Sequence, residues 1–466
     1  MGTVHAKVQE NLTEAHYPTN TARELPDKEQ MKELDLKGVR ARVDKVHIDG
    51  LSRTKNDIIQ DSIQDLFKAR DFWEVLLKAY TVRVKLDELG CFKNIAVYID
   101  TSKGPKATPD GLEVTFNVKE HKRILGGVST HVGNNEGVLQ IGVRAPNIFG
   151  RGEKVQVEYS HGSKKTSNFN VAFIKPFRGK HRTMLNTSIF QSNTEYPPSA
   201  YKLMEKGLTL GLGFYSWPLL KHTLQWEGTI RDLSVLSRNA SFDVRKESGL
   251  SLKSSLKHIL ALDLRDETIF PTTGSLVQLT SEYAGVGGDV GFLKNDVFVQ
   301  TNYSILPDIV LQGSLTMGYM KSINKDLKIS LADMYFLGGP LSVRGFQMRG
   351  IGPHSDGDAL GSNVYWAGGL HLFTPLPFRP GKGGFGDLFR THFFVNTGNV
   401  GNIEVKSGQS ILELMRNNVR LSYGLGIALR LGNMARLEIN YCFPYVHDKS
   451  DQTHPGVQFG VGVQFL

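Results

Sequence analysis

The stretch LSYGLGIALRL, Leu421 to Leu431, alternates without a break between two kinds of side chain. The odd positions are all apolar: Leu421, Tyr423, Leu425, Ile427, Leu429 and Leu431. The even positions are small or polar: Ser422, Gly424, Gly426, Ala428 and Arg430. Because successive side chains of a β-strand point to opposite faces, this stretch predicts a strand with one apolar face.

Three other stretches show the same alternation: KGLTLGLGF at 206–214, IVLQGSLTMGY at 309–319 and GVQFGVGVQFL at 456–466. In the last of them, Val457, Phe459, Val461, Val463 and Phe465 share the apolar face. An antiparallel sandwich would also alternate. Two features favour a membrane barrel instead. Runs of about nine to eleven residues are long enough to cross a bilayer at a tilt, and a glycine-rich, polar opposite face suits a hydrated lumen.

About sixteen such segments follow one another after residue 122. They begin near Leu125, Val138, Lys154, Ser167, Thr183, Gly207, Lys221, Lys253, Ser275, Phe292, Ile309, Asn363, Thr391, Val419, Arg436 and Gly456. We therefore predict a mainly β protein, with a transmembrane antiparallel β-barrel of about 16 strands over residues 123–466.

Residues 43–122 have a different pattern, typical of a small α+β domain. An alternating segment at its start is followed by a helix, which we expect Thr54 to cap together with Asp57 three residues later. A second helix is expected from near Asp71 to Gly90, a favourable residue for ending a helix. Two strands follow, so the predicted order is β-α-α-β-β. Residues 1–42 are polar and are expected to form a disordered tail.

The composition narrows the classes of protein that fit. The chain has 466 residues and a net charge of +9, and residues 1–122 hold 20 basic and 20 acidic residues, so all the excess lies in the predicted barrel. That excess suits anionic headgroups or an acidic partner, although it would also serve solubility. The two cysteines, Cys91 and Cys442, exclude a disulfide framework. The first residues lack the pattern of a secretory signal.

We find no pattern of catalytic residues. Ser342 is separated by two residues from the glycines on either side of it, so the G-x-S-x-G nucleophile motif is not met. The stretch HSDGD at 354–358 lacks the spacing of a calcium loop and is expected to form a solvated turn. We therefore expect a protein that is not an enzyme, with no cofactor, no bound metal and no nucleic-acid partner.

Four motifs indicate a family. They are GGPLSVRGF at 338–346, PNIFGRGE at 146–153, RDETIFPTTG at 265–274 and FVNTGNV at 394–400. A β-α-α-β-β module followed by a barrel with these motifs resembles the BamA-like superfamily of outer-membrane assembly proteins, whose soluble modules are called POTRA domains. Within it, residues 43–466 look like the barrel subunits of the mitochondrial sorting and assembly machinery, the fifty-kilodalton components of the SAM complex.

The resemblance implies a lumenal loop around residues 338–350, in which GGPLSVRGF folds back into the barrel. Val343, Arg344, Gly345 and Phe346 would then lie at the tip of the loop. In bacterial relatives the loop arginine pairs with an aspartate at the position of Asn396. A neutral partner gives roughly half the strength of a charge-assisted hydrogen bond. Two alternatives stay open: Arg344 finds another carboxylate, or the loop is held less firmly.

The resemblance also implies an insertase. Such a protein folds β-barrel precursors into the mitochondrial outer membrane by adding strands at a lateral gate between its first and last strands. The first strand of the gate includes Gly126, Gly127 and Val128, and its two glycines would weaken the pairing. The last strand resembles the targeting signal of the precursors at four positions: Gln458, Gly460, Val463 and Phe465.

The implied partners are β-barrel precursor polypeptides, membrane lipids, other SAM subunits (metaxin-like) and inner-membrane contact-site proteins. The POTRA-like domain would face the intermembrane space. Two alternatives to the insertase remain at this point. The barrel could be a passive outer-membrane channel, or the chain could be a bacterial or plastid barrel-assembly homologue.

Overall fold

The computed structural model describes nine stretches of the chain: residues 3–7, 38–105, 107–133, 135–177, 181–324, 327–377, 384–402, 417–432 and 435–466. It contains two compact units. Unit 1 comprises Met1–Leu125 and Arg144–Val155, and unit 2 comprises Gly126–Val143 and Gln156–Leu466. Within the described stretches, no helix combines the length and the apolarity needed to cross a membrane.

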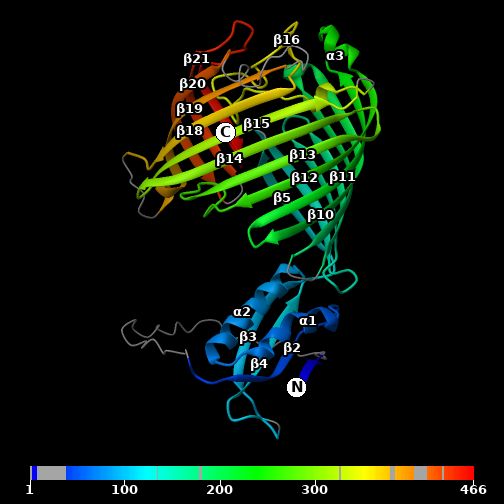
Figure 1. Cartoon of the computed structure of the whole chain (residues 1–466), viewed down its shortest axis with the longest axis vertical. Coiled ribbons are helices and arrows are strands. Elements are labelled where there is room, and N and C mark those ends of the chain that lie inside the picture. Colours follow the sequence, from blue (N-terminus) through cyan, green and yellow to red (C-terminus); the bar gives the residue numbers. More distant parts are fainter. Residues whose placement is uncertain are drawn as a thin grey trace. The chain divides into compact units, whose positions relative to one another are not determined.

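Unit 1 is an α+β domain with a four-stranded sheet in the order β1-β2-β4-β3 (Figure 1). The strands are β1 (Thr3–Lys7), β2 (Arg42–Asp49), β3 (Phe92–Thr101) and β4 (Gly111–Glu120). The helices are α1 (Asn56–Ile63), the 3-10 turn η1 (Gln64–Lys68) and α2 (Phe72–Glu88). The β2-α1-α2-β3-β4 segment has the element order that the sequence predicts.

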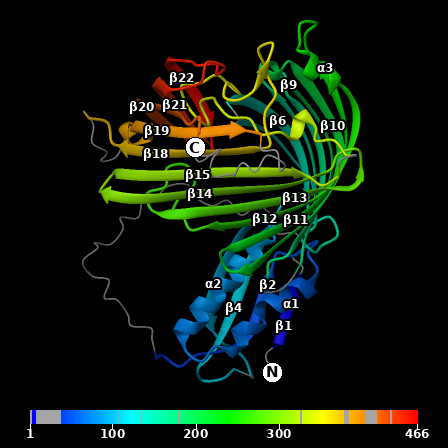
Figure 2. The same cartoon turned by 45° about the horizontal axis from the view of Figure 1, so that its top comes forward.

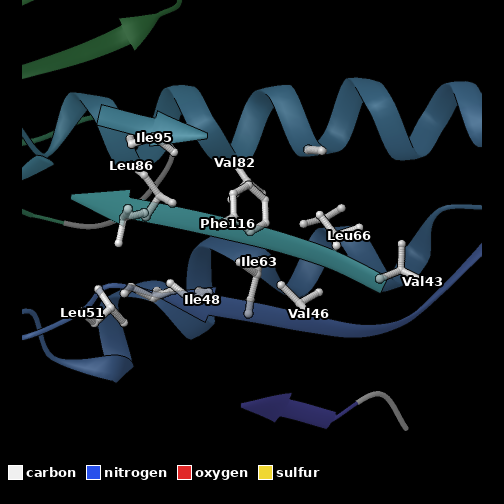
Figure 3. Close-up of a cluster of buried hydrophobic side chains, with 14 of the residues drawn as sticks. Val43, Val46, Ile48, Leu51, Ile63, Leu66, Val82, Leu86, Ile95 and Phe116 are labelled. Carbon is white, nitrogen blue, oxygen red and sulfur yellow. The ribbon is translucent and has the colours of Figure 1, made fainter. Parts of the chain in front are cut away.

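The core of unit 1 lies between α2 and the sheet. Figure 3 shows Val82 of α2 above the ring of Phe116 of β4, and Leu86 of α2 and Ile63 of α1 belong to the same buried cluster. All four side chains are buried. Since each buried side chain of this size contributes roughly 1.5–3 kcal/mol, this layer accounts for much of the domain's stability.

Two predictions for this region are wrong. Residues 1–42 are not uniformly a disordered tail, because Thr3–Lys7 form a strand parallel to β2; residues 8–37 lie outside the described stretches. Thr54 does not cap α1, which begins at Asn56 with no side-chain cap. Thr54 Oγ1 instead donates to Glu120 Oε1 at 2.7 Å and accepts from Asn147 Nδ2 at 2.8 Å, so both functions of its hydroxyl are used away from the helix.

Unit 2 is a single sheet of sixteen strands in which neighbours in sequence are neighbours in space (Figures 1 and 2). The first eight strands are β5 (Leu125–Gly133), β6 (Glu136–Pro146), β7 (Lys154–Gly162), β8 (Ser167–Pro176), β9 (Met184–Tyr196), β10 (Tyr201–Trp217), β11 (Leu220–Val235) and β12 (Gly249–Asp263). The last eight are β13 (Gly274–Gly288), β14 (Phe292–Leu306), β15 (Ile309–Ser322), β18 (Val364–Thr374), β19 (Phe389–Gly401), β20 (Arg420–Leu431), β21 (Ala435–Val446) and β22 (Gly456–Gly462). The predicted fold class and strand number are confirmed.

The largest boundary difference is in β10, which begins at Tyr201 rather than near Gly207. The extra residues Lys202 and Lys206 are not apolar, so the alternation that reveals a strand is missing there. They are nevertheless paired with both neighbours, Lys206 with Gln191 of β9 and Ile230 of β11. The hydrogen-bonded ladder therefore extends beyond the apolar band, which is the only part that periodicity can detect.

Register places the apolar side chains of neighbouring strands side by side on the outer face of the sheet. Leu425 of β20 lies between Phe393 of β19 and Tyr441 of β21, and all three side chains are exposed. The opposite face carries buried polar groups such as Ser422 and Glu438. Apolar residues outside and polar residues inside are the reverse of a soluble protein and the pattern expected of a barrel in lipid.

Candidate functional site: the lumenal loop and the barrel seam

The loop between β15 and β18 carries the motif GGPLSVRGF. Arg344 at its tip is fully buried, and so are Val343 and Phe346, which belong to an apolar cluster with residues of the surrounding strands. Gly338 has a φ of +106°, and a Cβ there would lie 2.7 Å from the carbonyl oxygen of Gln347. Only glycine fits this backbone path, which turns the loop back on itself.

Arg344 has a carboxylate partner. Its Nη2 and Nε lie 2.7 and 3.1 Å from Glu438 Oε2 of β21, and its Nη1 donates to Asn396 Oδ1 of β19 at 3.0 Å. The guanidinium also lies over the rings of Phe394 and Phe465, 5.1 and 5.5 Å from their centroids. A buried cation is stable only with such partners, so of the two alternatives the first holds: Arg344 finds another carboxylate.

Sequence reasoning missed Glu438. A signal was present, because Glu438 is an acidic residue on the non-apolar face of a strand segment whose other face is Leu437, Ile439 and Tyr441. A carboxylate that is buried on the inner face of a barrel needs a cation as its partner. Arg436, two residues away on the same face, lies 2.9 Å from Glu438 Oε1, and Arg344 supplies the second contact.

A chain of polar side chains leads from β18 to Glu438. His371 Nδ1 lies 2.9 Å from His392 Nε2, and His392 Nδ1 lies 3.0 Å from Asn440 Oδ1. Asn440 Nδ2 then donates to Glu438 Oε2 at 2.9 Å. All these side chains are buried, so the loop arginine is connected by hydrogen bonds to the inner faces of β18, β19 and β21.

The loop tip also holds the last strand. Gly345 N donates to Gln458 Oε1 of β22 at 2.9 Å, and Gln458 Nε2 donates to Phe346 O at 2.9 Å. The connection between β21 and β22 pairs with the loop as well, since His454 N donates to Gly345 O at 2.8 Å and Gln347 N donates to Gln452 O at 2.9 Å. The tip and the last hairpin therefore form one hydrogen-bonded body.

One expectation about the last strand is wrong. Val463 lies on the exposed outer face as predicted, but Phe465 does not share that face: it is 2% exposed. β22 ends at Gly462, and the ring of Phe465 lies 4.3 Å from Arg436 and 5.5 Å from Arg344. Two buried guanidinium groups attract the aromatic face, so the chain leaves the strand and turns into the lumen.

The loop is anchored on the opposite wall by Asp333. Its carboxylate oxygens lie 2.8 Å from Arg231 Nη1 of β11 and 3.1 Å from Lys253 Nζ of β12, and Lys253 also contacts Glu282 of β13 at 2.6 Å. Burial raises the pKa of Asp333, but the two cations outweigh it and the pKa is lowered overall. The loop thus spans the lumen between two charged anchors.

A third contact lies next to the tip. The guanidinium of Arg349 is placed between the rings of Tyr196 and Phe336, 4.2 and 3.8 Å from their centroids, and donates to Ser199 Oγ at 2.9 Å. Nothing in the sequence pattern marked Arg349 or Asp333, because most of their partners lie on other elements, 80 to 150 residues away along the chain.

The seam of the barrel lies between β5 and β22, which end the strand order. Within the residues that the structure describes, these strands are not hydrogen-bonded neighbours; Asn135 N donates to Val461 O at 3.1 Å and Val461 N donates to Asn135 Oδ1 at 3.2 Å. A Cβ at Gly126 or Gly127 would meet no atom within 4 Å, and Val128 is 68% exposed. Open space therefore surrounds the positions of Gly126 and Gly127 on β5.

The site has no evident place for a metal. Among the described residues, no group of three or more histidine, cysteine, aspartate or glutamate side chains is arranged to hold an ion. HSDGD forms a short hairpin of β16 (His354–Ser355) and β17 (Asp358–Ala359). The arrangement offers the edge of β5 next to β22, which the lumenal loop holds.

Comparison with known proteins agrees with this geometry. Residues 147–465 match the Omp85 superfamily domain. The chain is 45% identical to the sorting and assembly machinery component 50 homologs of Xenopus tropicalis and Homo sapiens, over the whole of both chains in each case. The crystal structure of BamA from Haemophilus ducreyi lacking POTRA domains 1–3 superimposes with a TM-score of 0.73 at 18% identity, covering 91% of this chain and 84% of that one. This transmembrane β-barrel protein therefore belongs to the Omp85 superfamily and, within it, to the family of sorting and assembly machinery component 50 homologs.

Proposed function

We propose that this protein inserts β-barrel precursors into the mitochondrial outer membrane by adding their strands at the seam between β5 and β22. The observation that carries the proposal is that both strands end the sheet and are joined in the described residues by contacts of Asn135 with Val461. The printed name of its relatives, a component of a sorting and assembly machinery, fits this role.

The physical need for such a template is clear. An unpaired backbone N–H or C=O costs several kcal/mol in lipid, so a precursor strand cannot enter the membrane alone. The edge of β5 offers those partners by strand addition. Gly126 and Gly127 lower the stability of any fixed pairing at this edge, which favours exchange over permanent closure.

β22 is the strand that an incoming precursor would replace. Its Gln458 and Gly460 face the lumen, where Gln458 is bound by the loop tip. A precursor whose last strand carries a polar residue and a glycine at the same spacing could offer the same contacts to the tip. The loop would then hold either strand in turn while β5 supplies the ladder.

The filled lumen argues against a passive channel. The loop is held on one wall by Glu438, on the other by Arg231 and Lys253, and at Arg349 by two aromatic rings. A pore that conducts solutes has no need of three such anchors. The chemistry proposed is strand exchange, with no bond made or broken.

The POTRA-like unit would face the intermembrane space, where precursors arrive and where inner-membrane contact-site proteins could bind. Its β3 is the outer strand of the described sheet and pairs with β4 alone, so it offers an edge to extended polypeptides. Other SAM subunits, metaxin-like proteins among them, are the remaining partners that we propose.

Cysteine crosslinking tests the template. In a chain with Cys91 and Cys442 replaced by Ala, Val128→Cys on β5 should crosslink to a cysteine in the last strand of a radiolabelled barrel precursor during assembly. Leu315→Cys on β15 is the matched control, because Leu315 also faces outward but β15 is paired on both sides. Equal crosslinking at the two positions would overturn the proposal.

A further inference from the structure

Unit 1 contains a cavity that the proposed function does not use. It measures about 590 Å³ and lies where β4 ends, between the turn at Gly50–Arg53 and the segment Asn117–Arg123. Gly50 has a φ of +93°, and a Cβ there would lie 2.0 Å from Val118 O, so the two chain segments meet at this glycine. We call it the juxtamembrane basic pocket.

The pocket is strongly cationic. Lys119, Lys122 and Arg123 line it with Arg53 and His121, and Lys119, Lys122 and Arg123 are all exposed. Within the described part of the chain, none of these three forms an ion pair with a carboxylate. Three cations close together without an anion repel one another, so their placement favours a bound anion.

The single carboxylate of the pocket is already satisfied. Glu120 accepts hydrogen bonds from the backbone N–H groups of Ser52, Arg53 and Thr54, from the hydroxyls of Ser52 and Thr54, and from Arg53 Nε. Burial raises the pKa of Glu120, but these bonds outweigh it and lower the pKa to about 2. The carboxylate of Glu120 is bound by the turn at Ser52–Thr54. Lys119, Lys122 and Arg123 are therefore available to bind a ligand.

The covalent chain places the pocket at the membrane surface. Arg123 lies two residues before Leu125, the first residue of the membrane strand β5, so their Cα atoms are at most about 7 Å apart. This holds whatever the orientation of unit 1. Ile124, between them, is an exposed apolar residue of the kind that enters the interface.

We propose that the juxtamembrane basic pocket binds the phosphate group of an anionic phospholipid in the leaflet on the side of unit 1. Clustered lysine and arginine next to a membrane segment attract such headgroups, and a guanidinium can bind two phosphate oxygens at once. A zwitterionic phosphatidylcholine headgroup carries its own cation and would be repelled by the same side chains. The pocket thus selects net negative lipids.

The test uses the full chain in nanodiscs of phosphatidylcholine with and without phosphatidylinositol, with native mass spectrometry counting the lipids retained on release. The wild-type chain should retain phosphatidylinositol preferentially, and the variant Lys119→Gln/Lys122→Gln/Arg123→Gln should lose at least about tenfold of that preference, since each cation contributes about fivefold. The charge-retaining variant Lys119→Arg/Lys122→Arg/Arg123→Lys should keep it.

The matched control is Lys78→Gln/Arg83→Gln/Lys85→Gln, which removes the same charge from α2 without touching the pocket. If this control loses as much preference as the pocket variant, or if the pocket variant retains the wild-type preference, the site is wrong. A last arm adds inorganic phosphate to detergent-solubilised protein. Displacement of phosphatidylinositol at equimolar phosphate would show a site for free phosphate and overturn the lipid assignment.

Discussion

The two strands that end the barrel sheet are held in opposite ways. β22 is bound on its lumenal side by the loop tip, through the side chain of Gln458, and is followed by Phe465 packed against two arginines. β5 carries two glycines with open space around them. The two ends of the sheet are therefore held unequally, with β22 bound by the loop tip; in the strand exchange that we propose, β5 would be the template.

The loop makes that asymmetry possible because it is itself braced. A loop fixed only at its tip would move with β22. Asp333 ties its first part to β11 and β12 on the far wall, so a shift of β22 has to break contacts with the loop rather than carry the loop along. Each restraint can be removed on its own by substitution of one side chain.

The largest effect is expected from Glu438→Ala. It leaves two buried guanidinium groups, Arg344 and Arg436, without the carboxylate they share, a change that costs about 3–5 kcal/mol. β22 should then exchange amide hydrogens as fast as β5, which would erase the difference between the two edges. The loss of stability is measured as the free energy of unfolding in lipid vesicles. The exchange rates of β22 and β5 are measured by hydrogen–deuterium exchange.

The triple variant Arg344→Met/Arg436→Met/Glu438→Leu is the control, because it removes all three buried charges of the cluster together. It should recover most of the lost stability while keeping the loop free of β21. Full stability in the single variant would mean that Asn396 and the two aromatic rings suffice to hold Arg344.

Asp333→Asn should cost about 3 kcal/mol, since Arg231 and Lys253 keep their burial and lose a charged partner. Exchange should rise in the loop and not in β5. The pKa of Asp333 is lowered in the folded protein, so its contribution is complete above the unfolded pKa near 4 and is lost as pH falls through the lower folded value.

The wild-type chain should therefore release the far anchor only in acid, and Asp333→Asn should lack that step of the pH profile. A variant whose loop exchange matches wild type from pH 7 to acid would show that Arg349 alone braces the loop.

Gln458→Ala should have an intermediate effect. It leaves Gly345 N and Phe346 O buried without their partners, which costs about 2 kcal/mol. Amide hydrogen exchange should increase at β22 alone, because the anchor at Asp333 stays intact. The difference between β22 and β5 would then be traced to one side chain. Gln458→Glu keeps the acceptor for Gly345 N. Its amide exchange at β22 should therefore lie between that of the wild-type chain and that of Gln458→Ala.

The barrel could be predicted from sequence because strand periodicity is local: the alternation at Leu421–Leu431 is complete within eleven residues. The partner of Arg344 could not, since Glu438 is 94 residues away and the register of several strands decides which side chains meet. The inward turn of Phe465 was missed for the same reason, because its position follows from cations on other elements and not from the pattern of its own strand.

The smallest effect is expected at β5. Gly126→Ala/Gly127→Ala should stabilise the strand by roughly 0.5–1 kcal/mol for each residue, because open space surrounds both glycines and alanine lowers the entropy of the unfolded chain. If β5 works as a mobile template, this gain should slow the insertion of a barrel precursor into proteoliposomes while leaving exchange at β22 unchanged. Gly313→Ala on β15, where a Cβ would lie 3.5 Å from Thr301 Oγ1, is the matched control in a strand paired on both sides, and it should leave the insertion rate as it is. Faster insertion by the β5 variant would contradict the role of β5 as a mobile template. It would mean that disorder of β5 slows insertion in the wild-type chain and that the edge which opens is β22.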